Sequence, residues 1–133
     1  MSRIIKFRGK RLDNGEWVYG YFYTIQEIEH YILQPCALGV LHTEVIPKTV
    51  GQFTGLLDKN GKEIYEGDIL HTITFGFNPE EFTAIILYRN CRFQLSNGRN
   101  LFYFGQSDLT RMDDTIVIGN IHDNPDLIKE ENK

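Results

Sequence analysis

Residues 53–70 constrain the fold of this chain more than any other segment, because they place two sharp bends close together. Asn60 and Gly61 both tolerate a positive φ angle, which suits a two-residue β-hairpin turn. Residues 66–68 (Glu-Gly-Asp) form a second cluster of turn residues, and an alternating apolar stretch follows at 69–75. The segment therefore predicts two bends that lead into a β-strand.

The same run resembles the central motif of the YopX family, whose members are small proteins of bacteriophages and bacterial prophages. Residues 5–10 (IKFRGK) and 15–20 (GEWVYG) are similar to the opening of that family, and residues 117–127 (VIGNIHDNPDL) are similar to its close. The three motifs occur in the family's order and span nearly the whole chain. The resemblance implies a phage or prophage origin and a small C-terminal barrel of SH3 type, and it implies no catalytic residues.

The length and composition favour a small, strand-rich protein. A chain of 133 residues is long enough for one domain or two very small ones. Nine Phe and seven Tyr favour strands over helices. Cys36 and Cys91 are far apart and lack metal-binding spacing, so we expect buried, reduced thiols. The N-terminal sequence is too charged and its apolar stretch too short for a signal peptide or membrane helix, which predicts a cytoplasmic protein in a bacterial host cell.

The net charge of -4 is unevenly distributed along the chain. Residues 1–50 carry six basic and five acidic side chains, whereas residues 51–133 carry eight basic and thirteen acidic ones. Neutralisation of phosphates by Lys and Arg provides most non-specific affinity for DNA, so the acidic body disfavours that activity. The basic segment within the first eleven residues is the exception.

The N-terminal half reads as short strands. Residues 3–8 and 16–23 flank an Asp-Asn-Gly turn and predict a hairpin. Residues 31–34 and 43–46 resemble two further strands, bounded by Pro35 and Pro47. We place a division near residue 60, which gives an N-terminal β region at 1–60 and a C-terminal region at 61–133 that pack together.

The C-terminal half reads as five short strands, which suit a small closed barrel. They are predicted at residues 69–75, 82–88, 92–95, 101–104 and 115–119. Asn124 and Pro125 are a plausible helix cap and first helical residue, so a short helix should follow at about 125–131. The expected fold is therefore mainly β: a hairpin-containing region packed on a C-terminal small SH3-type barrel, with a short C-terminal helix.

No catalytic, cofactor-binding or metal-binding motif is complete in the sequence. The spacing from Gly55 to Gly61 is one residue too long for a phosphate-binding loop, and a turn is the simpler interpretation. The four histidines have no metal-ligand spacing, and no serine lies in a nucleophile elbow. An enzyme would need a pocket that gathers residues such as His71, Asp113 and Asp114. We therefore expect no enzymatic activity, no cofactor and no metal.

Residues 17–23 alternate so that four aromatic side chains share one face of a strand, close in sequence to three cations. Rings beside cations can stack on nucleic-acid bases or anchor a protein interface. The alternative, which small β proteins favour, is that these rings pack in the core. The candidate binding surface consists of Arg8, Lys10, Arg11, Trp17, Tyr19, Tyr21 and Tyr23.

Two functions follow from these patterns. The first is a non-enzymatic intracellular binding or assembly module for protein partners or copies of itself. The second, less favoured by the acidic body, is a nucleic-acid-associated role in phage replication or regulation. Neither requires a membrane.

Overall fold

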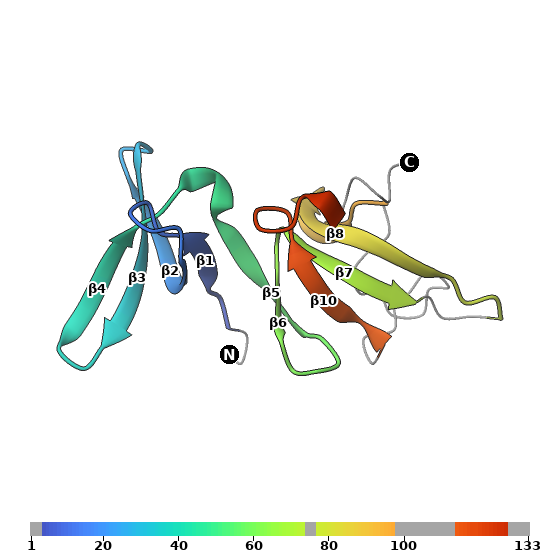
Figure 1. The fold of residues 1–133 in the computed structure, drawn as a ribbon. Helices are drawn as coiled ribbons and strands as arrows, with labels where there is room; N and C mark the ends of the chain where they lie inside the picture. Colours follow the sequence, from blue (N-terminus) through green and yellow to red (C-terminus); the bar gives the residue numbers. More distant parts are fainter. Residues whose placement is uncertain (1–3, 74–76, 98–113, 128–133) are drawn as a thin grey trace. The chain divides into compact units, whose positions relative to one another are not determined.

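The structure, a computed structural model, describes residues 4–73, 77–97 and 114–127. The chain divides into two compact units, Met1–Gly55 and Leu56–Lys133. Among the described residues, the secondary structure of both units is antiparallel strand with almost no helix (Figure 1). The prediction of a mainly β protein is therefore confirmed.

The first unit is a curved sheet with the strand order β4-β3-β2-β1-β5. Its strands are β1 (Phe7–Lys10), β2 (Trp17–Ile25), β3 (Glu29–Cys36), β4 (Gly39–Glu44) and β5 (Gly51–Leu57). A single 3-10 turn, η1 (Pro47–Thr49), connects β4 to β5. The β5 strand continues past Gly55 into the second unit, where its neighbour is β6 (Glu63–Tyr65).

One face of the first sheet forms its core. Val18, Ile32 and Val45 are buried there, and Phe7 and Phe22 pack against them. Within β2 the buried Val18 and the packed Phe22 have the same parity, so this strand turns its even-numbered side chains inward.

Gly20 lies between those two core residues because β2 approaches β3 closely at this position. A Cβ atom at residue 20 would lie 2.3 Å from the carbonyl oxygen of Leu33, a backbone atom that cannot rotate away. The pairing of Tyr21 with Leu33 and of Phe22 with Ile32 continues from this contact. Glycine therefore permits the register that directs Phe22 into the core.

The end of β4 meets the end of β1 at one point. The Leu12 amide donates to the Glu44 carbonyl at 3.0 Å, and the Ile46 amide donates to the Lys10 carbonyl at 2.8 Å. These bonds surround an isolated bridge between Arg11 and Val45. The sheet is therefore curled, and these bonds join the last residue of each strand, Glu44 of β4 and Lys10 of β1, to residues that follow the end of the other strand.

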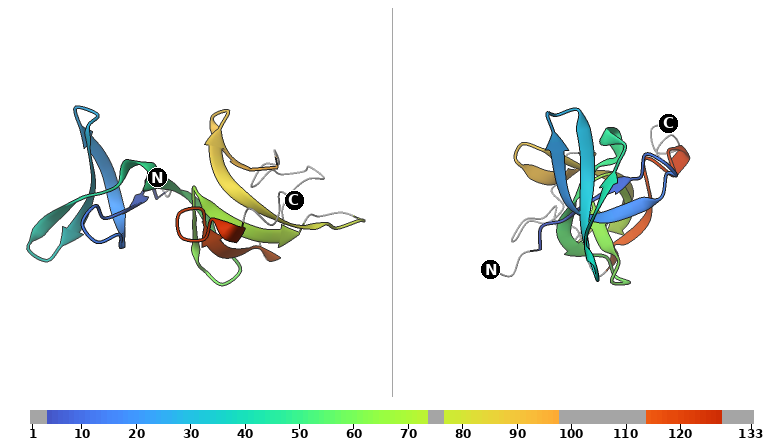
Figure 2. Two further views of the ribbon diagram at one scale, coloured as in Figure 1. Left: turned by 45° about the horizontal axis from the view of Figure 1, so that its top comes forward. Right: turned by 90° about the vertical axis from the view of Figure 1, so that its left-hand side faces the viewer.

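The second unit contains a sheet with the order β10-β7-β8-β9. Its strands are β7 (Asp68–Ile73), β8 (Glu81–Arg89), β9 (Arg92–Leu95) and β10 (Ile116–Asn120). The β8 strand curves strongly along its length (Figure 2). The core contains Ile64, Leu70, Ala84, Ile86, Leu95 and Val117, with Leu56, Phe82 and Phe93 packed around it.

The Asp58 carboxylate joins the first bend of this unit to β10. Asp58 is 6% exposed. Its Oδ1 accepts hydrogen bonds from the amides of Asn60 at 2.8 Å and Lys62 at 2.9 Å. Its Oδ2 accepts one from the Val117 amide at 3.1 Å, across 59 positions of the sequence. Burial raises the pKa of Asp58, but these bonds and the Lys62 charge outweigh it, so the pKa lies below its ordinary value.

The turn at Asn60-Gly61 differs in type from the prediction. Gly61 has a φ of 81°, but Asn60 is not among the residues with positive φ. The Gly61 amide donates to the Asp58 carbonyl, and the Asp58 amide donates to the Lys62 carbonyl. This is a three-residue loop in which a type I turn is followed by one left-handed glycine. The bend is where the sequence placed it, but it is one residue longer.

Several strand limits were wrong. The first strand begins at Phe7 instead of residue 3, and β4 covers Gly39–Glu44 instead of 43–46. The sequence missed β5 and β6, and β3 continues through Pro35. Pairing of β3 with β2 stops at Leu33, so the missing amide hydrogen of Pro35 removes no ladder bond there.

The SH3-type barrel and the C-terminal helix are not confirmed. No closed barrel is found among the described residues. The strand predicted at 101–104 lies outside the described residues, as does most of the helix predicted at 125–131, of which only 126–127 are described and helical. The side chain of Asn124, the predicted helix cap, instead accepts a hydrogen bond from the Asn120 amide.

The prediction of buried cysteines was wrong, because both Cys36 and Cys91 are free and exposed. Cys91 forms a tight turn with Asn90 between β8 and β9, and both residues have positive φ, at 62° and 55°. Residues at the tip of a two-residue hairpin turn point away from the core.

Replacement of Asp58 by Asn should destabilise the protein by about 1–3 kcal/mol. An amide can still accept at Oδ1, but its NH2 group would face the Val117 amide, so two donors would oppose each other. Urea unfolding at neutral pH measures the loss. Asp126→Asn, at an exposed position of the same unit, is the matched control and should unfold like the wild type.

The Asp58 carboxylate should also make stability depend on pH. Since its folded pKa is depressed, its contribution is present above the pKa of an unfolded aspartate, about 3.9. That contribution is lost as the pH falls through the lower folded value. Urea midpoints should therefore fall less steeply with acid in Asp58→Asn than in the wild type. Parallel curves would contradict this role.

Candidate binding surface

The four aromatic residues of the candidate site lie on the face of β2 opposite the core. Tyr19 is 44% exposed and Tyr21 is 58% exposed. Trp17 and Tyr23 are half-buried. Since the even-numbered side chains of β2 form the core, the odd-numbered rings lie on the outer face. The alternative that these rings pack in the core does not hold for Tyr19 and Tyr21, which are exposed.

Two cations of β1 lie on the same face as the rings. Arg8 pairs with Tyr19 and Lys10 pairs with Trp17 in the antiparallel register. The Arg8 guanidinium carbon is 4.5 Å from the Trp17 ring centroid, and the Lys10 Nζ is 5.4 Å from it. Arg8 is only 5% exposed. The buried guanidinium therefore lies over the indole ring as a cation–π contact, and the half-buried Lys10 lies over the same ring.

The surface continues onto β3 and β4 through Tyr23. The Tyr23 ring stacks on that of Tyr31, with centroids 5.2 Å apart and planes at 15°. The Tyr23 hydroxyl shares a hydrogen bond with Nδ1 of His42 at 2.5 Å. Burial and the nearby Glu29 carboxylate raise the pKa of Tyr31, so its hydroxyl stays protonated and donates to Glu29. We call Trp17, Tyr19, Tyr21, Tyr23 and Tyr31 the aromatic face.

Arg11 lies apart from the aromatic face. Its Nε and Nη2 donate to the two carboxylate oxygens of Asp13 at 2.9 and 2.8 Å. The hydrogen bond from Arg11 holds the pKa of Asp13 below its ordinary value. This pair neutralises the charge that the sequence assigned to the binding surface.

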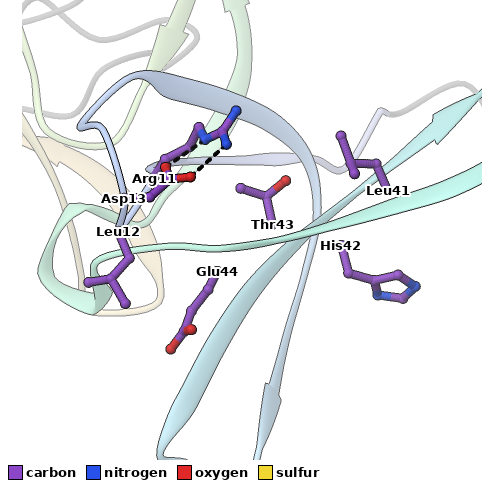
Figure 3. Close-up of a pocket in the computed structure, with 7 residues that line it drawn as sticks. All are labelled: Arg11, Leu12, Asp13, Leu41, His42, Thr43 and Glu44. Carbon is purple, nitrogen blue, oxygen red and sulfur yellow. Dashed lines mark hydrogen bonds and ion pairs between the residues drawn. The ribbon is translucent and has the colours of Figure 1, made fainter.

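The Arg11–Asp13 pair lines a pocket of about 450 Å³ beside β4 (Figure 3). We call it the fork pocket, because it lies where the β1 end and β4 separate. Figure 3 shows the Arg11–Asp13 pair on one side and the β4 residues on the other. Its lining is Arg11, Leu12, Asp13, Leu41, His42, Thr43 and Glu44.

The structure therefore brings together six of the seven predicted site residues and separates Arg11. It also adds residues that sequence reasoning missed. Lys6 lies over the Phe53 ring at 5.4 Å, beside the β1 cations. The signal for Lys6 was the alternate spacing of residues 6, 8 and 10 on one strand. Phe53 and Tyr31 carried no such signal, because their positions depend on strand register.

A second pocket, of about 400 Å³, lies in the second unit. It is lined in part by Lys59, His71, Glu81 and Asp114. The pocket therefore contains His71 and Asp114, two of the three residues that a catalytic pocket would have to gather. The third, Asp113, lies outside the described residues. His71 Nε2 is 4.0 Å from Glu81, and both side chains are largely in solvent, at 42% and 71% exposure. Water therefore screens this pair.

In the described part of the chain, no three His, Cys, Asp or Glu residues gather closely enough to hold a metal ion. No helix within these residues has the length and apolar character needed to cross a membrane.

Comparison with known proteins identifies a family and similar solved structures. A family model described as "YopX protein" matches residues 6–129. The crystal structure of protein EF1440 from Enterococcus faecalis is similar, with 26% sequence identity and a TM-score of 0.57. The match covers 96% of this chain and 99% of that one. Among curated proteins, none matches the chain.

The single Trp should report the local charge of the aromatic face. Because Lys10 and Arg8 lie beside a half-buried Trp17, iodide should quench Trp fluorescence more strongly than caesium does. Lys10→Gln should reduce this difference. Lys48→Gln, an exposed charge change in the same unit, is the control and should leave it unchanged. Equal quenching by the two ions in the wild type would contradict the cationic environment.

Proposed function

The chain belongs to the YopX family, and from this premise we propose that it is a non-enzymatic binding module that binds protein through its aromatic face. We propose that it acts in the cytoplasm of a bacterial host cell and is encoded by a phage or prophage. Membership of the family assigns no activity, so the proposal depends on the surface itself. A protein partner is the favoured ligand.

The observation that supports the proposal is the exposure of Tyr19 and Tyr21. Tyrosine offers a large, rigid contact surface with few rotatable bonds, and it is enriched at the energetic centres of interfaces. The aromatic face occupies one continuous side of β2 and β3, and Lys10 lies at its edge. Exposed aromatic rings with a polar border are typical of a protein contact.

A second candidate is single-stranded nucleic acid, because cations alternate with rings on this face. Rings can stack on bases while Lys and Arg neutralise phosphates. Lys6 and Lys10 are half-buried, whereas Arg8 is buried against Trp17. Two half-buried cations give a small electrostatic contribution, so this candidate ranks below protein binding.

Tyr21→Ser should abolish the capture of a specific host or phage protein without loss of stability, because 58% of the residue is already in solvent. Affinity capture from infected cells, read by mass spectrometry, measures this. Tyr88→Ser is the matched control, since Tyr88 is 54% exposed in the second unit. Capture that is the same for the wild type and both variants would contradict binding by the aromatic face.

Nucleic-acid binding is tested by a salt titration with single-stranded DNA and RNA. If Lys6 and Lys10 each neutralise one phosphate, log K should fall with log salt with a slope of about -1.4. Lys10→Gln should halve that slope. If no binding is detected at low salt, the nucleic-acid candidate is rejected and protein binding is unaffected.

A further inference from the structure

The β4 strand has an open side. It is the outermost strand of the first sheet. Within the described residues, the only chain segment hydrogen-bonded to that side is the end of β1, through the Leu12 amide and the Glu44 carbonyl. Val40 and Leu41 are 53% and 52% exposed. The strand edge from Gly39 to His42 is therefore in solvent, whereas Thr43 is buried.

The backbone hydrogen bonds at the end of β4 identify the groups that point to this open side. The Val45 amide donates to the His30 carbonyl at 2.9 Å, so this residue pair is a hydrogen-bonded pair with β3. Hydrogen-bonded and non-hydrogen-bonded pairs alternate along antiparallel strands. Residues 43 and 41 therefore bond to β3, whereas residues 44, 42 and 40 point outward.

Two observations agree with this assignment. Glu44, predicted to point outward, gives its carbonyl to Leu12. Val40, also predicted to point outward, pairs with Pro35, which has no amide hydrogen to donate. The amides and carbonyls of Val40 and His42 are therefore available to an added strand.

The open edge lacks the usual protection against pairing. Natural edge strands carry Lys, Pro or a bulge that prevents edge-to-edge association. Residues 39–43 read Gly-Val-Leu-His-Thr, and their pairing with β3 is continuous. A strand with exposed Val and Leu and no such protection is a template for β-strand addition.

We propose that a second copy of this chain occupies this edge, with the two β4 strands antiparallel about a two-fold axis at Leu41. The outward groups of Val40 then meet those of His42 of the partner copy, and the reverse pair forms by symmetry. Four backbone hydrogen bonds result. Leu41 meets Leu41 of the partner copy, so each covers the other's exposed apolar surface.

In the same register, a side chain of the partner copy fills the fork pocket. This register places Leu38 of the partner copy opposite Glu44, at the mouth of the fork pocket lined in part by Leu12 and Leu41. Leu38 is 99% exposed at the tip of the β3–β4 hairpin. Each copy offers one apolar tip and one pocket, which is the self-complementarity that a two-fold interface requires. The pairing uses backbone groups of the β4 edge, whereas the protein binding proposed above uses the aromatic side chains of β2 and β3.

Charges at position 41 test the two-fold axis directly. Leu41→Lys and Leu41→Glu each place like charges opposite each other, so each variant alone should dimerise at least about tenfold more weakly than the wild type. An equimolar mixture should regain association as a heterodimer. Sedimentation velocity over a concentration series measures all three samples. If the mixture stays as monomeric as its components, the proposed register is wrong.

A backbone variant provides a second test. Val40→Pro removes an outward amide and no bond to β3, so the sheet should fold while dimerisation is lost. Circular dichroism of thermal unfolding verifies the fold. Tyr21→Ser should leave dimerisation unchanged, which separates this proposal from that for the aromatic face. A wild type that remains monomeric at every concentration, or a dimer that survives Val40→Pro, would overturn the inference.

Discussion

The alternation of side chains along β2 is the constraint on which the N-terminal unit depends. Val18 and Phe22 must enter the core, and successive residues of a strand point to opposite faces. A slip of one residue would therefore exchange the core face and the aromatic face. Gly20 stabilises the correct register, because any side chain there would collide with the Leu33 carbonyl. The exposure of Tyr19 and Tyr21 is thus a consequence of how the core is packed.

The second unit depends on a different interaction, the buried carboxylate of Asp58. It satisfies the amides of a tight bend and of β10 at once, so a local turn and a distant strand are held by one side chain. Asp68 repeats this on a smaller scale, because its Oδ2 accepts a hydrogen bond from the Tyr65 amide at 2.8 Å. The acidic residues of the central motif therefore have a structural role in shaping the backbone.

Sequence reasoning succeeded where the signal was local. The 92–95 strand and the parity of residues 17–23 follow from alternation alone, and the structure has both. It failed where the structure depends on which strands pair and in which register. β5 and β6 were missed because their sequence resembles turns, and Cys91 is exposed because it lies in a turn that lacks the usual glycine. Among site residues, the pairing of Arg11 with Asp13 and the approach of Phe53 to Lys6 depend on contacts that no short pattern encodes.

The central claim is that folding leaves the aromatic face open and that a cellular protein covers it. Tyrosine nitration, read by mass spectrometry in purified protein and in extract of infected cells, tests both parts. The account predicts rapid nitration of Tyr19 and Tyr21 in purified protein and protection in extract, while Tyr65, at 2% exposure, resists in both. The account would be contradicted if Tyr19 and Tyr21 were as unreactive as Tyr65 in purified protein. It would also be contradicted if they reacted as fast in extract as in purified protein.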